Sequence, residues 1–138
     1  MKKLTYGICF LLLLPSNVLA EEAAAVHVDV LAKTSSSWDG SRLPDYPKGT
    51  PEITILRIKI PPGVQLPLHK HTKINAGLLL DGELTVVTED SKTLHLKAGD
   101  TIVEVVNKWH YGKNEGTKMA EILVFYAGVL DTPITIEK

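Results

Sequence analysis

The stretch that most constrains this chain covers residues 63–82, which read GVQLPLHKHTKINAGLLLDG. It carries His69 and His71 two positions apart, with Asn75 four positions further on. Because alternate side chains of an extended strand share a face, these three polar side chains can point the same way. Turn-forming residues border the apolar run, as they border a strand of a closed sheet. Two imidazoles and an amide on one face form half of a metal site, and His110 is the obvious candidate to complete it.

Beyond residue 51 the chain alternates short apolar runs with turn signals, which predicts an all-β domain. Asp81-Gly82 between two apolar runs is a strong hairpin signal. Many short strands at a spacing of about 8–12 residues are typical of a sandwich or barrel. The expected strands cover residues 52–60, 74–80, 83–88, 93–97, 101–106, 118–126 and 134–136. We therefore expect a small β-barrel, whose interior can hold one small ligand.

The first of these strands has a mixed pattern of apolar residues. Ile53 and Ile55 share one parity, whereas Leu56 and the following apolar residues take the other. A β-bulge near Ile55 and Leu56 would bring both sets to the same face. Arg57 is interpreted as a solvated or rim residue, and the alternative is an inward arginine that binds a substrate carboxylate.

The first 20 residues are predicted to be a secretory signal peptide. Two lysines precede the apolar run of residues 4–14, Pro15 ends this run, and small residues lead up to Ala20. A membrane anchor is the alternative, but it needs about 20 apolar residues, and this run is shorter. We expect cleavage near Ala20 and a periplasmic or secreted protein that has no membrane segment after cleavage.

Cleavage would change the charge of the chain and remove its cysteine. Two of the 15 basic residues would be lost, so 13 basic and 16 acidic residues would give a net charge of about −3. Cys9 would be lost as well, and the mature chain could form no disulfide. The sequence contains no basic block of the kind that binds nucleic acid. We expect the partner to be a small-molecule ligand or substrate.

Residues 21–51 are expected to form an N-terminal arm, and residues 52–138 a single barrel domain. Residues 26–33 alternate valines with polar residues and predict a short strand, whereas residues 35–51 are rich in Ser, Gly and Pro and predict a loop. Trp38 and Tyr46 are expected to pack this arm against the barrel, or else to line a ligand site. The exposed strand edges that an arm offers would be covered in a homodimer.

The spacing of glycines and histidines resembles the cupin superfamily, in its small single-domain form. The first cupin motif is matched by Gly63, His69-Lys70-His71, Asn75 and Gly82, separated by five, three and six residues. Asn75 occupies the position of the usual glutamate. The second motif is matched in part by Gly99, Val105, Asn107, His110 and Asn114, where Val105 and Asn107 replace the usual proline and glycine. The resemblance spans residues 52–126 and implies a jelly-roll barrel, or double-stranded β-helix.

The same resemblance implies that His69, His71 and His110 bind a divalent metal ion, which could be Zn, Cu, Fe, Mn or Ni. Asn75 would be a weak ligand, a hydrogen-bonding group beside metal-bound water or substrate, or a polar filler. Glu104 is the nearby acid that could compensate for the missing glutamate. Its alternative interpretation is a rim carboxylate paired with a lysine.

Two classes of function remain open from the sequence. The first is a metal-dependent enzyme that acts on a small extracytoplasmic molecule, with dioxygenase- or lyase-like chemistry; no catalytic base is identified. The second is a non-catalytic module that binds a metal or a small ligand. A barrel that has lost its metal and is purely structural is a third reading. The fold does not decide among them.

Overall fold

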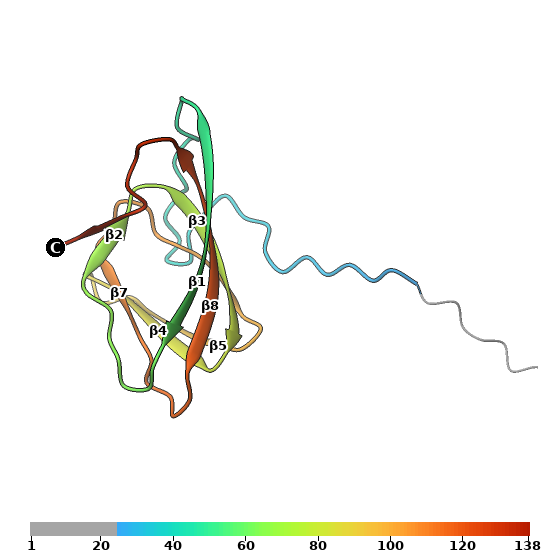
Figure 1. Cartoon of the computed structure of the whole chain (residues 1–138), viewed down its shortest axis with the longest axis vertical. Coiled ribbons are helices and arrows are strands. Elements are labelled where there is room, and N and C mark those ends of the chain that lie inside the picture. Colours follow the sequence, from blue (N-terminus) through green and yellow to red (C-terminus); the bar gives the residue numbers. More distant parts are fainter. Residues whose placement is uncertain (1–24) are drawn as a thin grey trace, which may run out of the picture.

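A computed structural model of the chain describes residues 25–138 (Figure 1). The predicted signal peptide and the start of the arm lie outside the described residues. Within the described part, the elements are β1 (Pro51–Ile60), β2 (His69–His71), β3 (Ile74–Asp81), β4 (Glu83–Thr88), β5 (Thr93–Lys97), β6 (Thr101–Val103), β7 (His110–Lys113), β8 (Ala120–Val129) and β9 (Thr135–Glu137). No helix among residues 25–138 is long and apolar enough to cross a membrane.

The strands form two antiparallel sheets that face each other, with the core between them. One sheet has the order β1-β8-β3-β6, and the other has the order β5-β4-β7-β2-β9. Both orders are non-consecutive, so the chain crosses repeatedly from one sheet to the other and encloses the interior (Figure 1). This architecture confirms the small all-β jelly-roll barrel that the sequence predicts.

Several strand boundaries agree with the sequence prediction, and the disagreements are local. β4 and β5 cover the expected residues, and Gly82 makes the turn before β4 with a φ of 74°. A Cβ at position 82 would lie 2.5 Å from the carbonyl oxygen of Met119, so only glycine fits this turn. β6 ends at Val103, three residues earlier than predicted, and β7 was not predicted as a strand.

The predicted bulge in β1 is wrong. The pairing of β1 with β8 runs without a shift from Pro51 opposite Val129 to Ile60 opposite Ala120. Ile53 and Ile55 therefore remain on the outer face, where their side chains are 65% and 57% exposed. The prediction assumed that every apolar residue of the strand points inward, but in this sheet the outer face is apolar as well.

Arg57 also lies on the outer face. Its Nε is 3.4 Å from the Glu121 Oε1 atom, and the same carboxylate lies 3.4 Å from the Lys59 amino group through Oε2. The interpretation as a solvated residue is confirmed, and the alternative of an inward carboxylate-binding arginine is wrong.

The arm contacts the barrel through its middle part. Trp38 packs against the core, and its backbone N–H donates to the carbonyl oxygen of Val103 at 2.9 Å. Tyr46, in contrast, is 75% exposed, so its predicted packing role is wrong. The predicted strand at residues 26–33 is wrong too, because this segment is extended but pairs with no other described strand. It projects away from the barrel (Figure 1).

Candidate metal centre

Two neighbouring strands of one sheet bring three histidines together. β2 supplies His69 and His71, whose side chains share a face, and β7 supplies His110 directly opposite His69 in the register. The ring centroids of the three pairs are 4.5, 5.0 and 5.0 Å apart. One potential ligand atom of each ring lies within 4.8 Å of those of the other two. Lys70, between the paired histidines, points the other way and lies over the Trp109 ring.

Each imidazole is oriented by a hydrogen bond from Nδ1 to the main chain. The acceptors are the carbonyl oxygens of Pro67, Ile134 and Lys108, at 2.7 Å from His69, 3.1 Å from His71 and 2.9 Å from His110. A carbonyl can only accept, so Nδ1 carries the hydrogen and Nε2 keeps its lone pair. Carbonyl bonds of this kind hold metal-binding histidines in one tautomer and one orientation.

The charge state of the three histidines suits a cation. Burial lowers the pKa of His69, of His110 and, to about 3, of His71. The imidazoles are therefore neutral at physiological pH, which is the form that binds a metal ion. The Nε2 atom of His110 is buried and has no hydrogen-bond partner among the described residues.

Asn75 lies beside this group but does not reproduce the role of a carboxylate. Its side chain is 1% exposed, and Nδ2 donates to the carbonyl oxygen of Lys73 at 3.3 Å. Its Oδ1 atom is buried without a partner in the described part of the chain. Asn75 thus offers the site one neutral oxygen and no negative charge.

Glu104 does not lie on the rim paired with a lysine, so that interpretation is wrong. Its side chain is 12% exposed, and Oε2 lies 3.6 Å from His110 Nε2. This Oε2 atom is buried and forms no hydrogen bond within residues 25–138. Burial raises the pKa of Glu104 to about 7. This burial has no signal in the sequence, because β6 ends at Val103, after which strand parity no longer tells which way a side chain points.

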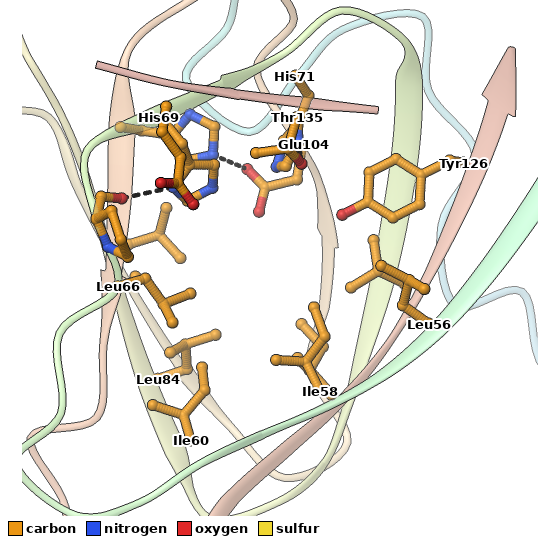
Figure 2. A pocket seen from close by; sticks show the side chains of 17 residues that line it. Leu56, Ile58, Ile60, Leu66, His69, His71, Leu84, Glu104, Tyr126 and Thr135 are labelled. Carbon is orange, nitrogen blue, oxygen red and sulfur yellow. Dashed lines mark hydrogen bonds and ion pairs between the residues drawn. The ribbon is translucent and has the colours of Figure 1, made fainter. Parts of the chain in front are cut away.

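The three histidines and Glu104 face a cavity of about 220 Å³ inside the barrel. We call its two parts the polar end, formed by His69, His71, His110, Glu104 and Tyr126, and the apolar end, formed by Leu56, Ile58, Ile60, Leu66 and Leu84. Figure 2 shows both ends, with the Tyr126 hydroxyl directed into the cavity on the side of Glu104. No lysine or arginine is among the described residues that line it.

Two residues that line the cavity, Tyr126 and Thr135, were not singled out in the sequence. Tyr126 has the same parity as Val124 on β8, so its inward position could have been deduced from that strand. Burial, together with the nearby Glu104, raises its pKa to about 12. Thr135 places its hydroxyl oxygen 3.2 Å from His71 Nδ1. No sequence signal pointed to Thr135, because it contacts His71 through the short β2–β9 pairing.

The donor set fits a divalent cation. Three neutral imidazoles with fixed Nε2 lone pairs suit Zn, Cu, Fe or Ni, and a nearby carboxylate suits Mn as well. Three of the buried atoms that lack partners among residues 25–138 belong to this site: His110 Nε2, Asn75 Oδ1 and Glu104 Oε2. With Glu104 ionised, all three are acceptors. Buried acceptors that cluster without donors are costly unless a cation or water satisfies them.

Solved structures similar to this chain share its fold. An oxalate oxidase in complex with the substrate analogue glycolate has a TM-score of 0.53 and 24% identity, over 62% of this chain and 45% of that chain. The DMSP lyase DddQ from Ruegeria pomeroyi DSS-3 has a TM-score of 0.55 and 21% identity, over 62% and 43%. This chain therefore spans less than half the length of either.

A protein closer in size is an uncharacterized conserved protein with a double-stranded β-helix domain from Klebsiella pneumoniae. It has a TM-score of 0.53 and 18% identity, over 67% of this chain and 88% of that chain. No curated protein sequence matches this chain significantly. The cupin domain family, however, matches residues 56–126, which is more than half of the chain and includes all three histidines. This protein therefore belongs to the cupin domain family.

Proposed function

We propose that this protein holds a divalent metal ion through His69, His71 and His110 and uses it to act on a small molecule. The observation that carries the proposal is the Nδ1-to-carbonyl bond of each imidazole, which leaves Nε2 free at the polar end of the cavity. A bound metal ion would supply a Lewis acid and a template for the polar group of the substrate.

The lining of the cavity favours a substrate that has a small polar group at one end and an apolar remainder. The polar group would meet the polar end, and the remainder would lie against the leucines and isoleucines of the apolar end (Figure 2). Because no lysine or arginine lines the cavity within residues 25–138, a substrate with two negative charges would lack a counter-ion beyond the metal. Neutral and singly charged molecules are therefore favoured. The oxalate oxidase and the DMSP lyase, by their names, also act on small molecules.

Two side chains of the polar end favour an enzyme over a passive binder. A buried carboxyl group with a pKa of about 7, as in Glu104, is typical of functional sites. The Tyr126 hydroxyl stays protonated at neutral pH and can donate a hydrogen bond to a molecule in the cavity. Dioxygenase- or lyase-like chemistry is the form of activity that we propose.

Metal analysis followed by activity assays tests this proposal. We expect purified protein to contain close to one equivalent of a divalent metal, and His71→Ala to contain almost none. Oxygen uptake and product analysis with catechols, diketones and thiols would then identify the chemistry. Metal-loaded protein that binds members of this panel without converting them would instead be a non-catalytic binding module. Wild-type protein that takes up no divalent metal would contradict the proposal.

We propose that the protein is exported and processed near Ala20. The support is the charged start, apolar run and small-residue exit of residues 1–20. Expression of the full chain in a bacterial host, followed by osmotic shock, should release a species whose intact mass corresponds to residues 21–138. A species of full-length mass that remains with the membrane fraction would contradict export with cleavage.

We also propose a homodimer that covers the outer face of the sheet containing β1 and β8. Ile55 and Phe125 are register partners on this face and are 57% and 46% exposed. β1 is an edge strand of ten residues, and the extended arm segment at residues 26–33 carries exposed valines. Unpaired edges and apolar faces of this kind are usually covered by another chain.

The dimer is tested by substitution on the two sheets. Phe125→Asp should convert the dimer into a monomer in light scattering after size exclusion. Ile136→Asp, an equally drastic change at an exposed position of the other sheet, should leave the dimer intact. A wild-type protein that is monomeric at all concentrations would contradict this arrangement.

A further inference from the structure

We propose that the Glu104 carboxylate is the fourth protein ligand of the metal ion and takes the place of the glutamate that cupins usually carry at the position of Asn75. The inference rests on the proposed three-histidine site and adds a residue from a different part of the chain. In this arrangement the negative charge of the site comes from Glu104, in the segment after β6, and Asn75 is a neutral neighbour.

Glu104 and Asn75 are neighbours across two paired strands. β3 and β6 pair antiparallel, with Ala76 opposite Val103. Beyond this pair, the backbone N–H of Glu104 donates to the carbonyl oxygen of Asn75 at 3.1 Å. The main chain of residue 104 therefore lies directly beside that of residue 75. A carboxylate at position 104 and a carboxylate at position 75 would lie on the same side of the barrel.

The main chain around Glu104 is fixed on both sides. Ser37 of the arm donates its hydroxyl hydrogen to the Glu104 carbonyl oxygen at 2.8 Å, and this serine is buried. Three residues later, the backbone N–H of Asn107 donates to the His71 carbonyl oxygen at 2.7 Å. Asn107 has a φ of 56°, a left-handed conformation that asparagine tolerates better than most residues. The segment is thus tied to the arm and to β2, which carries two of the histidines.

The surroundings of the carboxylate lack a cation. Within residues 25–138, the sole basic side chain within 4 Å of Glu104 is His110, which is itself neutral. The separation of 3.6 Å exceeds that of an N–H···O hydrogen bond, about 2.7–3.2 Å. A buried carboxylate without a partner is costly, and buried charges in proteins are normally paired or bound to metal. A divalent cation among the Nε2 atoms would be the missing partner.

Metal affinity measured on the apo-protein tests this assignment. Zn²⁺ or Co²⁺ is titrated into wild type, Glu104→Gln and Glu137→Gln in the presence of a competing chelator. Glu137 is the matched control, because it also lines the cavity but is exposed at its surface. Changes to residues around a metal site typically lower metal affinity by about 10–100-fold. We expect Glu104→Gln to lower it by at least as much. Glu137→Gln should stay close to wild type.

A second variant tests whether a carboxylate at position 75 can replace the one at position 104. Asn75→Glu combined with Glu104→Gln restores a carboxylate at the usual cupin position and should recover most of the lost affinity. The visible absorption of bound Co²⁺ gives an independent readout, because its intensity and position follow the ligands. The spectrum should change in Glu104→Gln and should be unchanged in Glu137→Gln.

Thermal unfolding of the apo-proteins shows whether a loss of metal affinity is caused by a loss of fold stability. Apo Glu104→Gln should be at least as stable as apo wild type, since it removes a carboxyl group buried without a partner. Equal metal affinity of wild type and Glu104→Gln would overturn the assignment, as would an equal loss in Glu137→Gln. A double variant as weak as Glu104→Gln would also overturn it. Wild type that binds no metal would overturn the three-histidine site together with this inference.

Discussion

The polar and apolar ends of the cavity are built on shared strands but are held in place by different forces. β8 contributes Tyr126 to the polar end and Ile122 and Val124 to the apolar lining. At the polar end, hydrogen bonds to main-chain carbonyls fix each imidazole in one orientation. At the apolar end, side chains are held by packing, which has no preferred direction. Changes at the polar end should therefore alter metal binding, and changes at the apolar end should alter stability and ligand size.

The largest effect is expected for His110→Ala at the polar end. Removing one of three imidazoles should lower metal affinity by more than the roughly 100-fold upper range known for changes around a metal site. The fold should survive, because the variant removes a buried polar group that lacks a partner at Nε2. Metal content after dialysis measures the effect. His95→Ala, at an exposed position of β5, is the control and should keep the full metal content. If both variants retained metal, the polar end would not be the binding site.

Leu84→Ala at the apolar end should lower stability and leave metal affinity nearly unchanged. Leu84 is 5% exposed and belongs to the core, so truncation should lower the free energy of unfolding by about 2–5 kcal/mol. Metal affinity should remain within a few-fold of wild type, because no ligand or carbonyl acceptor is touched. Denaturant unfolding of the apo-protein and metal titration measure the two quantities. A loss of metal affinity as large as that of His110→Ala would show that the two ends are not independent.

Within the cavity, the pH dependence of stability should arise at the polar end. The pKa of His71 falls from 6.5 to about 3 on folding, so the unfolded chain binds more protons between these values. Stability from this group is fully present above pH 6.5 and is lost as the pH falls toward 3, by about 1.4 kcal/mol per pH unit. The pKa of Glu104 rises from 4.5 to about 7, so its contribution has the opposite sign and is lost as the pH rises through that interval.

The lowered pKa values of His69 and His110 act in the same direction as that of His71, so apo wild type should become less stable on acidification below pH 6.5. Glu104→Gln removes the opposing contribution and should show a steeper decline between about pH 7 and 4.5. Leu84→Ala should lower the whole curve without changing its slope, because the apolar end has no titrating group. Thermal melts of the apo-proteins over this range measure the slopes. A Leu84→Ala curve with a different slope would contradict the separation of the two ends.

The smallest effect is expected for Gly112→Ala. A Cβ at this position would point toward Leu66 and Leu84, with ordinary contacts of 3.5 Å to each. The extra methyl group narrows the apolar end without strain, and stability should be unchanged or rise by about 0.4–1 kcal/mol. Affinity for a series of catechols with growing alkyl groups should fall for the bulkiest members, by about 1–3 kcal/mol per excess methylene. Uniform affinity across the series would show that the apolar part of the ligand lies elsewhere.

Much of the fold could be predicted because its signals are local. The Asp81-Gly82 hairpin and the alternating strands β4 and β5 lie where the sequence places them, since turn chemistry and strand parity act over a few residues. The grouping of His69, His71 and His110 was expected from strand parity and family spacing. The structure brings the three imidazoles together, although their ligand role remains a prediction.

The sequence could not reveal features that depend on distant contacts. Glu104 lies beyond the end of β6, and its position follows from bonds to Ser37 and Asn75 that are far away in the chain. The outward direction of Ile53 and Ile55 follows from pairing with β8, whose outer face is apolar too. Parity tells which residues share a face, but it does not tell which face is inside when both are apolar.

The three carbonyl acceptors have a consequence for the order in which the protein matures. Pro67, Lys108 and Ile134 are distributed over almost the whole barrel, so no short piece of the chain can hold the imidazoles in register. If the protein binds a metal ion as proposed, the complete three-histidine site would form only after the barrel has closed. The amount of bound metal would then report the fraction of chains that have folded completely, and an incompletely folded chain would not compete for the ion.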